Sequence, residues 1–423
     1  MELSGFSPSE AFDIQDDQSL APNSDVIEKL LYRIQKTSRK TRNIYSEYSR
    51  DVTWEQLLQK TEDYRLWVFN RTATLTKIQK HRFANADTEA AIKGFFVCDC
   101  VHTDPVTGDT FPFVAICRSV PKLLFNQSQP ENVRVNGFLF NRVSRDQVTK
   151  PVFIVDRLGW FPSKESDQAT PSQVLLSQHG LDFGEYEFVA PNDKDGLTKK
   201  DSEAFYQTIA AVGRITEKRR QEFFTANPPI KFRELMQNGS SNFGNRVRVK
   251  GVVRTCSQVH VTDPDIRERL GLSTYYQLIL FPNLDGGKII LKNRNGEDLV
   301  YSRFPVTVCV ANLPDGMTPS DVERKPYEIE GFFFRFWKYK ADKTDAAGVS
   351  GQVSPLIIAN KPTVLESEQE LLNSILLVFA AIVLGGIAVT LFLYRSSDKK
   401  HKQAKGSILD ELPEQIDLTG ITE

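Results

Sequence analysis

Acidic side chains that stand close together in the sequence are the first candidates for chemistry. Asp263, Asp265 and Glu268 are near enough to one another to share a divalent cation through their carboxylates. The segment Asp263-Pro-Asp265 also has the composition of a helix start, where a carboxylate accepts backbone N–H groups and complements the helix dipole. Because helix starts of this kind are far more common, we interpret these residues as the cap of a short helix over Thr262 to Gly271.

Two cysteines in an apolar run are the next candidates. Cys98 and Cys100 are two residues apart and so share one face of a predicted strand, as a pair of metal ligands would. No second pair has zinc-site spacing, and buried free thiols account for the same pattern. The sequence also lacks phosphate-binding, dinucleotide-binding, nucleophile-elbow and metalloprotease motifs. We therefore predict no catalytic residue, no metal site and no cofactor, and a protein that is not an enzyme.

An aromatic and basic segment, Phe332 to Lys340, is the strongest candidate for ligand binding. Side chains of a strand alternate between two faces, so every second residue from Phe332 should fill the interior of a barrel. The residues expected on the outer face are Phe333, Arg335, Trp337 and Tyr339. Such a strip could stack bases or sugars. The alternative is that this face packs against a helix or a second domain.

The overall composition limits the classes of partner. Hydrophobic residues make up 40% of the 423 residues and charged residues 25%, which is typical of globular domains. The formal net charge is −1, whereas nucleic-acid-binding proteins usually carry a clear basic excess. Composition therefore argues against nucleic acid as the partner.

A series of similar segments recurs along the chain in the same order, which predicts a duplicated domain. Alternating apolar residues mark the first strand of each copy: Trp67, Phe69, Ala73 and Leu75 in one, and Val247, Val249, Gly251 and Val253 in the other. Later strands correspond in the same way, and each copy begins with an amphipathic helix. Gly137 and Gly331 occupy equivalent places in the longest strand, where a small barrel needs a sharp bend. The pattern predicts an OB-like barrel in each copy, with an open antiparallel sandwich as the alternative.

One segment near the C-terminus has the length and composition of a membrane span. Ile375 to Leu393 contains no charged residue, and roughly 20 apolar residues are needed to cross the hydrocarbon core. Tyr394 follows where an interfacial aromatic residue is expected. We predict that residues 375–394 contact the lipid bilayer.

The charges beside this span predict its orientation. Arg395 to Lys405 is basic, whereas Glu366 to Glu370 is acidic, so the tail is expected in the cytoplasm and the large N-terminal part outside the inner membrane. Met1 to Asn23 has no apolar stretch of a signal peptide. Three explanations remain open: a start site further upstream, a span that inserts by itself, or domains that face the cytosol.

These elements give a predicted fold that is mainly β with flanking helices (α+β), built from two tandem OB-like antiparallel barrels and one C-terminal transmembrane helix. Asn283 to Arg303 is expected to form a hairpin or a long loop. The predicted organisation is a disordered segment at 1–23, a first helix plus OB-like domain at 24–162, a linker at 163–201, a second helix plus OB-like domain at 202–365, the transmembrane helix at 371–394, and a basic then acidic tail at 395–423.

Several segments carry a resemblance to a known family. They are Leu158 to Pro162, Glu203 to Gln207, Val261 to Leu272, Tyr275-Tyr276, Val308 to Gly316, Gly331 to Tyr339 and Ser354 to Ile358. In these segments the chain resembles an uncharacterised family of planctomycete membrane proteins, more closely in the second copy than in the first. Members end in a hydrophobic span followed by basic residues, as here. They also tend to begin with a membrane segment, which this sequence lacks, and the resemblance implies no activity.

The sequence therefore favours a membrane-anchored, non-enzymatic binding or scaffold protein of the cell envelope, with a protein or a polymer as its ligand. The alternative is a membrane-tethered single-stranded nucleic-acid-binding OB protein that faces the cytosol, and its basis is the strip around Trp337.

Overall fold

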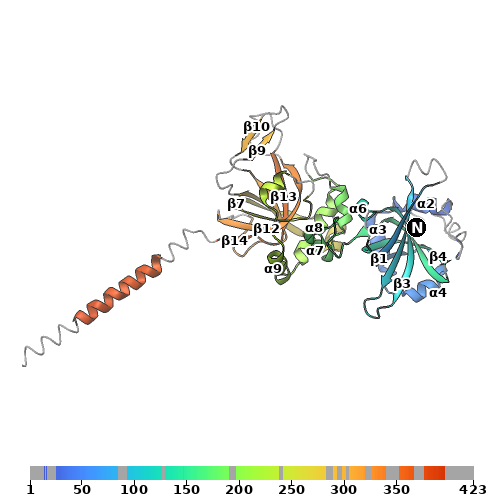
Figure 1. The fold of residues 1–423 in the computed structure, drawn as a ribbon, viewed down its shortest axis with the longest axis horizontal. Coiled ribbons are helices and arrows are strands. Elements are labelled where there is room, and N and C mark those ends of the chain that lie inside the picture. Colours follow the sequence, from blue (N-terminus) through green and yellow to red (C-terminus); the bar gives the residue numbers. More distant parts are fainter. Residues whose placement is uncertain are drawn as a thin grey trace, which may run out of the picture. The chain divides into compact units, whose positions relative to one another are not determined.

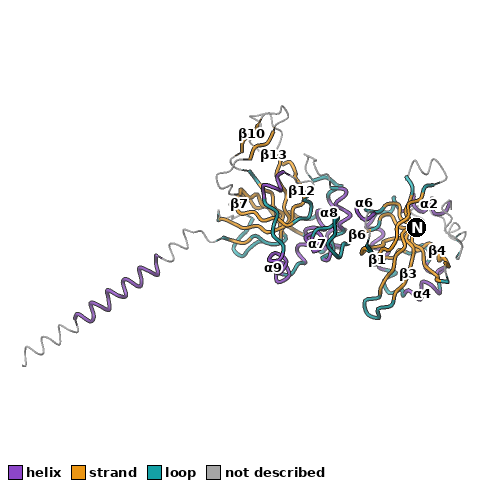
Figure 2. Tube along the Cα trace, in the orientation of Figure 1, coloured by secondary structure: helices purple, strands orange, loops and turns teal. Residues whose placement is uncertain are grey.

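The computed structural model contains two compact units, residues 1–364 and residues 365–423, and each is described by itself. The structure describes residues 14, 16, 25–83, 93–125, 129–145, 147–189, 197–237, 242–282, 289–292, 298–301, 304–319, 325–339, 352–365 and 376–395. Figures 1 and 2 show the helices and strands of these ranges.

The first barrel is closed by five strands. They are β1 (Val68–His81), β2 (Phe95–Thr103), β3 (Thr110–Ser119), β4 (Glu131–Arg145) and β5 (Val148–Arg157). Their order is β1-β2-β3-β5-β4, and β4 pairs with β1 to complete the barrel. Only β3 and β5 are parallel, while the other pairs of this barrel are antiparallel. This is an OB-like topology, to which the short β6 (Gly159–Trp160) adds an edge beside β4.

The second barrel repeats that topology strand for strand. Its strands are β7 (Arg246–His260), β8 (Thr274–Pro282), β11 (Val306–Val310), β12 (Pro326–Tyr339) and β13 (Gln352–Ala359). The order is β7-β8-β11-β13-β12, with β12 paired to β7 and with β11 parallel to β13. The short β14 (Thr363–Val364) lies beside β12, and a hairpin of β9 (Ile289–Lys292) and β10 (Asp298–Tyr301) precedes β11. The predicted tandem OB-like barrels are confirmed, as is a hairpin within Asn283 to Arg303.

A glycine allows a close approach of two strands in each barrel. A Cβ atom at Gly137 would lie 2.2 Å from the carbonyl oxygen of Ile154, and one at Gly331 would lie 2.5 Å from that of Ile358. Each strand shifts its register a few residues later, at Leu139/Asn141 in β4 and at Phe333/Arg335 in β12. The glycines therefore let the longest strand bend onto its neighbour, and the bulge follows the bend.

Equivalent helices cover equivalent parts of the two barrels. The helix α2 (Asp25–Ile34) packs on β5, and α8 (Ser202–Arg214) packs on β13. The short helices α4 (Trp54–Gln59) and α10 (Phe232–Gln237) contribute a buried leucine each to the barrel cores, Leu57 and Leu235. The remaining helical elements are α3 (Arg39–Glu47), η2 (Thr61–Tyr64), α6 (Lys122–Phe125), α9 (Glu217–Ala226) and α11 (Pro264–Leu270).

The segment predicted as a linker is instead part of the core. It contains α7 (Pro171–Gln178) and the 3-10 helix η3 (Phe183–Phe188), and Leu176 and Phe183 are buried in the same hydrophobic cluster as the first barrel interior and α8. Thr170 and Gln173 form a capping box at the start of α7. Figure 1 shows α7 and α8 between the two sheets, so this connecting segment joins the barrels into one unit.

Two residues of the predicted disordered N-terminal segment are described, and both contact the first barrel. Ile14 is buried among the apolar residues under α2, and Asp16 pairs with Arg65 at 3.2 Å. The other residues of 1–23 lie outside the described residues.

The described residues of the second unit form one helix long and apolar enough to cross a membrane, Leu376–Arg395, with a mean hydropathy of 2.8. It coincides with the predicted span except for 371–375, which lie outside the described residues. The tail at 396–423 also lies outside them.

Candidate functional site

The predicted aromatic and basic strip does not form an exposed face. Phe333 and Arg335 are fully buried and Trp337 is half-buried, while the side chain of Tyr339 lies outside the described residues. Phe333 packs in the barrel interior, while its neighbour Phe334 contacts Phe205 of α8 and its neighbour Phe332 contacts Phe224 of α9. The prediction was wrong in its exposure because helices and the connecting segment cover the outer face of β12, and because Phe333 lies on its inner face. The alternative, packing against a helix, describes these residues better.

The other candidates from the sequence are structural. Asp263 is the N-cap of α11 and accepts the backbone N–H of Asp265 at 2.9 Å, and Gly271 ends the helix with a positive φ of 66°. All five cysteines are buried free thiols, and burial raises the pKa of Cys100. Within the described ranges, no group of three His, Cys, Asp or Glu residues could hold a metal ion.

A large charged cleft lies where the first barrel, the connecting segment and α8 meet, and we call it the arginine cleft. Its volume is about 920 Å³. Its basic side chains are Arg39, Lys40, Arg42, Arg118, Arg134, Arg157, Arg214 and Arg269. Its carboxylates are Glu47, Asp156, Asp182, Asp265 and Glu268. Such a density of guanidinium groups makes this the strongest candidate site in the part of the chain that the structure describes.

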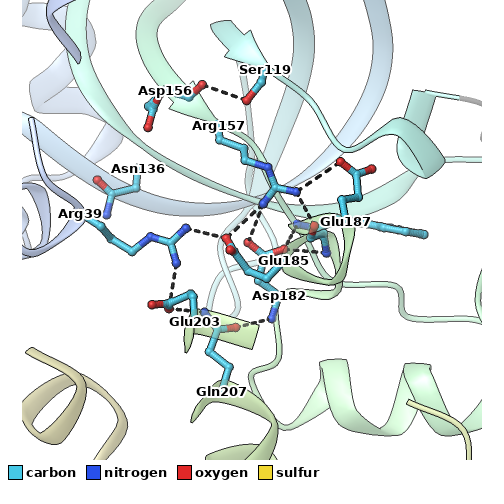
Figure 3. Close-up of polar contacts among 12 residues, drawn as sticks. Arg39, Ser119, Asn136, Asp156, Arg157, Asp182, Glu185, Glu187, Glu203 and Gln207 are labelled. Atoms are coloured by element: carbon cyan, nitrogen blue, oxygen red, sulfur yellow. Dashed lines mark hydrogen bonds and ion pairs between the residues drawn. The ribbon is translucent and has the colours of Figure 1, made fainter. Parts of the chain in front are cut away.

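The side chain of one arginine of α3, in the first domain, contacts residues of the connecting segment and of the second domain. Ser38 caps α3 by accepting the backbone N–H of Thr41, which fixes Arg39 in the first turn. The guanidinium of Arg39 pairs with Glu185 of η3 and, at 2.8 Å, with Glu203 of α8 (Figure 3). Burial alone would lower the pKa of Arg39, but the two carboxylates raise it overall. This arginine therefore stays charged and connects the two domains.

A second cluster holds the connecting segment against the barrel. Arg157 at the end of β5 donates to Glu185 at 3.1 Å and lies 4.0 Å from the Oδ2 atom of Asp182 (Figure 3). Asp182 is buried, and its Oδ1 atom accepts the backbone N–H groups of Trp160 and Gly184. Burial, with the repulsion from Glu185, raises the pKa of Asp182 to about 6.

Other arginines of the cleft are also neutralised by carboxylates. Asp156 accepts from Arg118 at 2.8 Å and pairs with the buried Arg42 at 3.3 Å. Arg269 on α11 forms a bidentate pair with Glu203, at 2.8 and 2.9 Å. These pairs explain how so many guanidinium groups can gather in one place.

Arg134 and Arg214 differ from these arginines because neither has a carboxylate within 4.0 Å among the described residues. Both side chains are exposed in the cleft. The guanidinium of Arg134 lies over the ring of Phe161, 4.5 Å from its centroid, and Arg214 donates to the backbone carbonyls of His179 and Leu270. These two arginines are held in place by uncharged groups and keep their charge available to a ligand.

Sequence reasoning missed this site. The arginines are scattered from Arg39 to Arg269 and gather only through the packing of the connecting segment, which composition alone marks as a linker. Arg39 and Arg42, spaced three residues apart in α3, were the one local signal of a basic helix face.

No protein-family model and no curated protein matches the chain. The single-stranded DNA binding protein from Thermus aquaticus is 8% identical over 71% of this chain and 92% of its own, with a TM-score of 0.16. A deletion mutant of that protein is 8% identical over 72% of this chain and 97% of its own, with a TM-score of 0.15. A small single-stranded DNA binding protein from Mycoplasma pneumoniae is 10% identical over 29% of this chain and 94% of its own, with a TM-score of 0.13. Similarity at this level carries no argument about function.

Proposed function

We propose that the chain is a membrane-anchored, non-enzymatic binding protein of the cell envelope, and that its arginine cleft binds anionic groups of a protein or polymer ligand. The observation that carries this proposal is the pair Arg134 and Arg214, which are exposed in the cleft without a carboxylate partner among the described residues. Their planar guanidinium groups fit carboxylate or phosphate oxygens in a bidentate manner.

The crowding of like charges supports an anionic ligand. The pKa of Arg134 is lowered, chiefly by desolvation of its guanidinium in the cleft; the carboxylate of Asp182 opposes this shift, and the positive charges of Arg214 and Arg269 add to it. A bound anion would relieve this repulsion, so binding and the charged state of the arginines favour each other. Ion pairs hold the rest of the cleft in place, which reduces the cost of ordering side chains on binding.

The experiment is a calorimetric titration of the full-length chain in lipid nanodiscs with poly-glutamate and, separately, with inorganic polyphosphate. We expect binding that weakens as salt rises, because the cleft is open to solvent. The variant Arg134→Glu/Arg214→Glu should lose at least tenfold in affinity, whereas Arg267→Glu, an exposed arginine of α11 outside the cleft, should bind like the parent chain. An equal loss of affinity in both variants would show that net charge alone causes the effect. A lack of binding to both polymers would contradict the proposal.

The membrane part of the proposal rests on the apolar helix Leu376–Arg395 and on the charge difference between its flanks. The positive-inside rule supports a single pass through the inner membrane, with residues 1–364 outside and the basic tail in the cytoplasm.

The alternative is a cytosol-facing binder of single-stranded nucleic acid, and the observation in its favour is the OB-like topology of both barrels. The aromatic and basic strip around Trp337 gives this alternative less support than its sequence suggests, because Phe333 and Arg335 are buried. Binding of a 30-nucleotide oligothymidine that is stronger than that of poly-glutamate, and equally sensitive to the loss of Arg134 and Arg214, would favour the alternative.

A further inference from the structure

A second concavity lies along another face of α3, and we call it the aromatic groove. Its volume is about 670 Å³, and its wall includes the rings of Tyr45, Tyr48 and Trp67. Thr41, Tyr45 and Tyr48 follow one another at helical spacing and so share one side of the helix and its end. The groove is therefore built from α3 on one side and from the start of β1 on the other.

The three rings are unusually open to solvent. Tyr45 is 44% exposed, Tyr48 72% and Trp67 41%. Tyr45 and Tyr48 lie 6.4 Å apart between ring centroids, and Tyr64 contacts Trp67 edge-on at 5.3 Å, which fixes the orientation of the indole. Single exposed apolar residues need no explanation, whereas aromatic residues gathered in a groove indicate a binding surface.

The backbone turns Trp67 toward the groove at some cost. Leu66 has a φ of 64°, in the left-handed region that leucine rarely adopts. Backbone hydrogen bonds hold it there, from Leu66 N–H to Leu139 at 2.8 Å and from Leu139 N–H to Trp67 at 2.9 Å. The alternation Trp67, Phe69, Ala73 predicts an inward Trp67, and this turn exposes it instead. A strained residue directly before an exposed ring is typical of a functional site.

The charge of the groove limits its occupant. Among the described residues that line it, Lys36 is the one cation and none carries a carboxylate. Thr37, Ser38 and Thr41 also line the groove. The hydroxyls of Ser38 and Thr41 lie 2.8 Å apart and that of Thr37 donates to the carbonyl of Arg33, but a hydroxyl has two lone pairs, so each can accept a further hydrogen bond. A nucleic-acid strand would bring a phosphate with every base and require more than one cation. The backbone of a proline-rich peptide has carbonyls that accept hydrogen bonds but few N–H groups that donate them. It could therefore use the hydroxyls of the groove only as donors.

We propose that the aromatic groove binds an uncharged polysaccharide strand, with pyranose rings stacked on Tyr48 and Trp67 and with sugar hydroxyls paired to the hydroxyls of the groove. Sugar rings offer flat faces of C–H groups together with hydroxyls at their edges, which matches flat aromatic rings beside hydroxyl side chains. This site adds a second ligand class to the proposed function; Tyr48 also lines the arginine cleft, whereas Trp67 lines the aromatic groove alone of the two.

The experiment titrates the full-length chain in nanodiscs with hexamers of β-1,4-linked glucose and of β-1,4-linked N-acetylglucosamine. Tryptophan fluorescence follows Trp67, and saturation-transfer NMR follows the sugar protons. We expect at least one hexamer to bind, a loss of tenfold or more in Trp67→Ala and in Tyr48→Ala, and recovery of binding in Trp67→Phe. Tyr32→Ala removes a ring that is 45% exposed but does not line the groove, and it should bind like the parent chain.

Three results would overturn the inference. They are no binding of either hexamer, binding that survives Trp67→Ala, and stronger Trp67-dependent binding of oligothymidine or of a polyproline peptide. The variant Arg134→Glu/Arg214→Glu serves as a further control. It should bind the hexamers like the parent chain, whether or not the arginine cleft binds an anionic ligand. Circular dichroism of each variant separates a loss of ligand binding from a loss of fold.

Discussion

Arg335 and Asp201 form an ion pair at 2.8 Å in which neither side chain is exposed to solvent. Asp201 directly precedes α8, and its second oxygen accepts the N–H and the hydroxyl of Thr198 at 2.7 and 2.8 Å. The pair joins β12 of the second barrel to the start of the helix that covers it. The arginine that sequence alone assigns to ligand binding thus has a structural role.

The first prediction concerns this pair. Arg335→Met leaves Asp201 as a buried charge without its partner, and breaking a buried pair in this way costs about 3–5 kcal/mol. Urea unfolding followed by tryptophan fluorescence measures the effect, because the four tryptophans of the chain lie within residues 1–364.

The double variant Arg335→Met/Asp201→Asn provides the control for this pair. It removes both charges and keeps an oxygen at the helix start, so it should recover part of the lost stability. Equal destabilisation of the single and double variants would contradict the role of the unpaired charge.

The second prediction concerns pH. The pKa of Asp182 in the folded chain, about 6, lies above its usual value of 3.8, because burial disfavours the charged carboxylate. Between these two values the folded state binds more protons than the unfolded state, so the free energy of unfolding falls as pH rises from about 4 to 6. Asp182→Asn should remove that fall and increase stability at pH 7.5, by at most about 3 kcal/mol.

The neighbouring Glu203 allows the two effects to be separated. Burial alone would raise its pKa, but Arg39 and Arg269 lower it overall, so its contribution to stability is lost only as pH falls below the usual value of 4.5. Urea titrations at several pH values between 4.5 and 8 therefore report on Asp182 together with Glu131, whose pKa burial also raises, and the difference between the parent chain and Asp182→Asn isolates Asp182. A slope that is unchanged in Asp182→Asn would assign the dependence to another group.

The third prediction concerns membrane topology. The five native thiols are buried, so the folded chain should react slowly with a membrane-impermeant maleimide. Ser163→Cys places a thiol on an exposed part of the connecting segment, and Ser407→Cys places one in the tail. In intact cells we expect labelling of the first and not of the second, and labelling of both after the cells are opened. The reverse pattern would place the barrels in the cytosol and overturn the envelope proposal.

Periodicity was sufficient to predict the barrels because each strand buries one face and leaves a period of two in the sequence. It could not place Phe333, because both faces of β12 are buried around it, and it could not place Trp67, because the left-handed Leu66 precedes it and turns it outward. The arginine cleft could not be predicted from the sequence for another reason. Its side chains come from both domains, and the segment that brings them together was predicted as a linker because Ser, Gln, Asp and Gly are frequent in it, although Phe183 and Tyr186 are buried in the fold.

The fourth prediction concerns the bends that close the barrels. A Cβ atom at Gly331 would lie 2.5 Å from the carbonyl oxygen of Ile358 and 2.9 Å from the Cβ atom of Ala359, so two paired strands would have to move apart. We expect Gly331→Ala to destabilise the folded chain by about 1–3 kcal/mol or more, as overpacking does in a dense core. Gly213→Ala is the matched control, because its Cβ atom would meet only Ala311 at an ordinary 3.6 Å and alanine favours the helix α8. Thermal unfolding of both variants checks the pair, and similar melting temperatures would show that the strands can separate at Gly331 without cost.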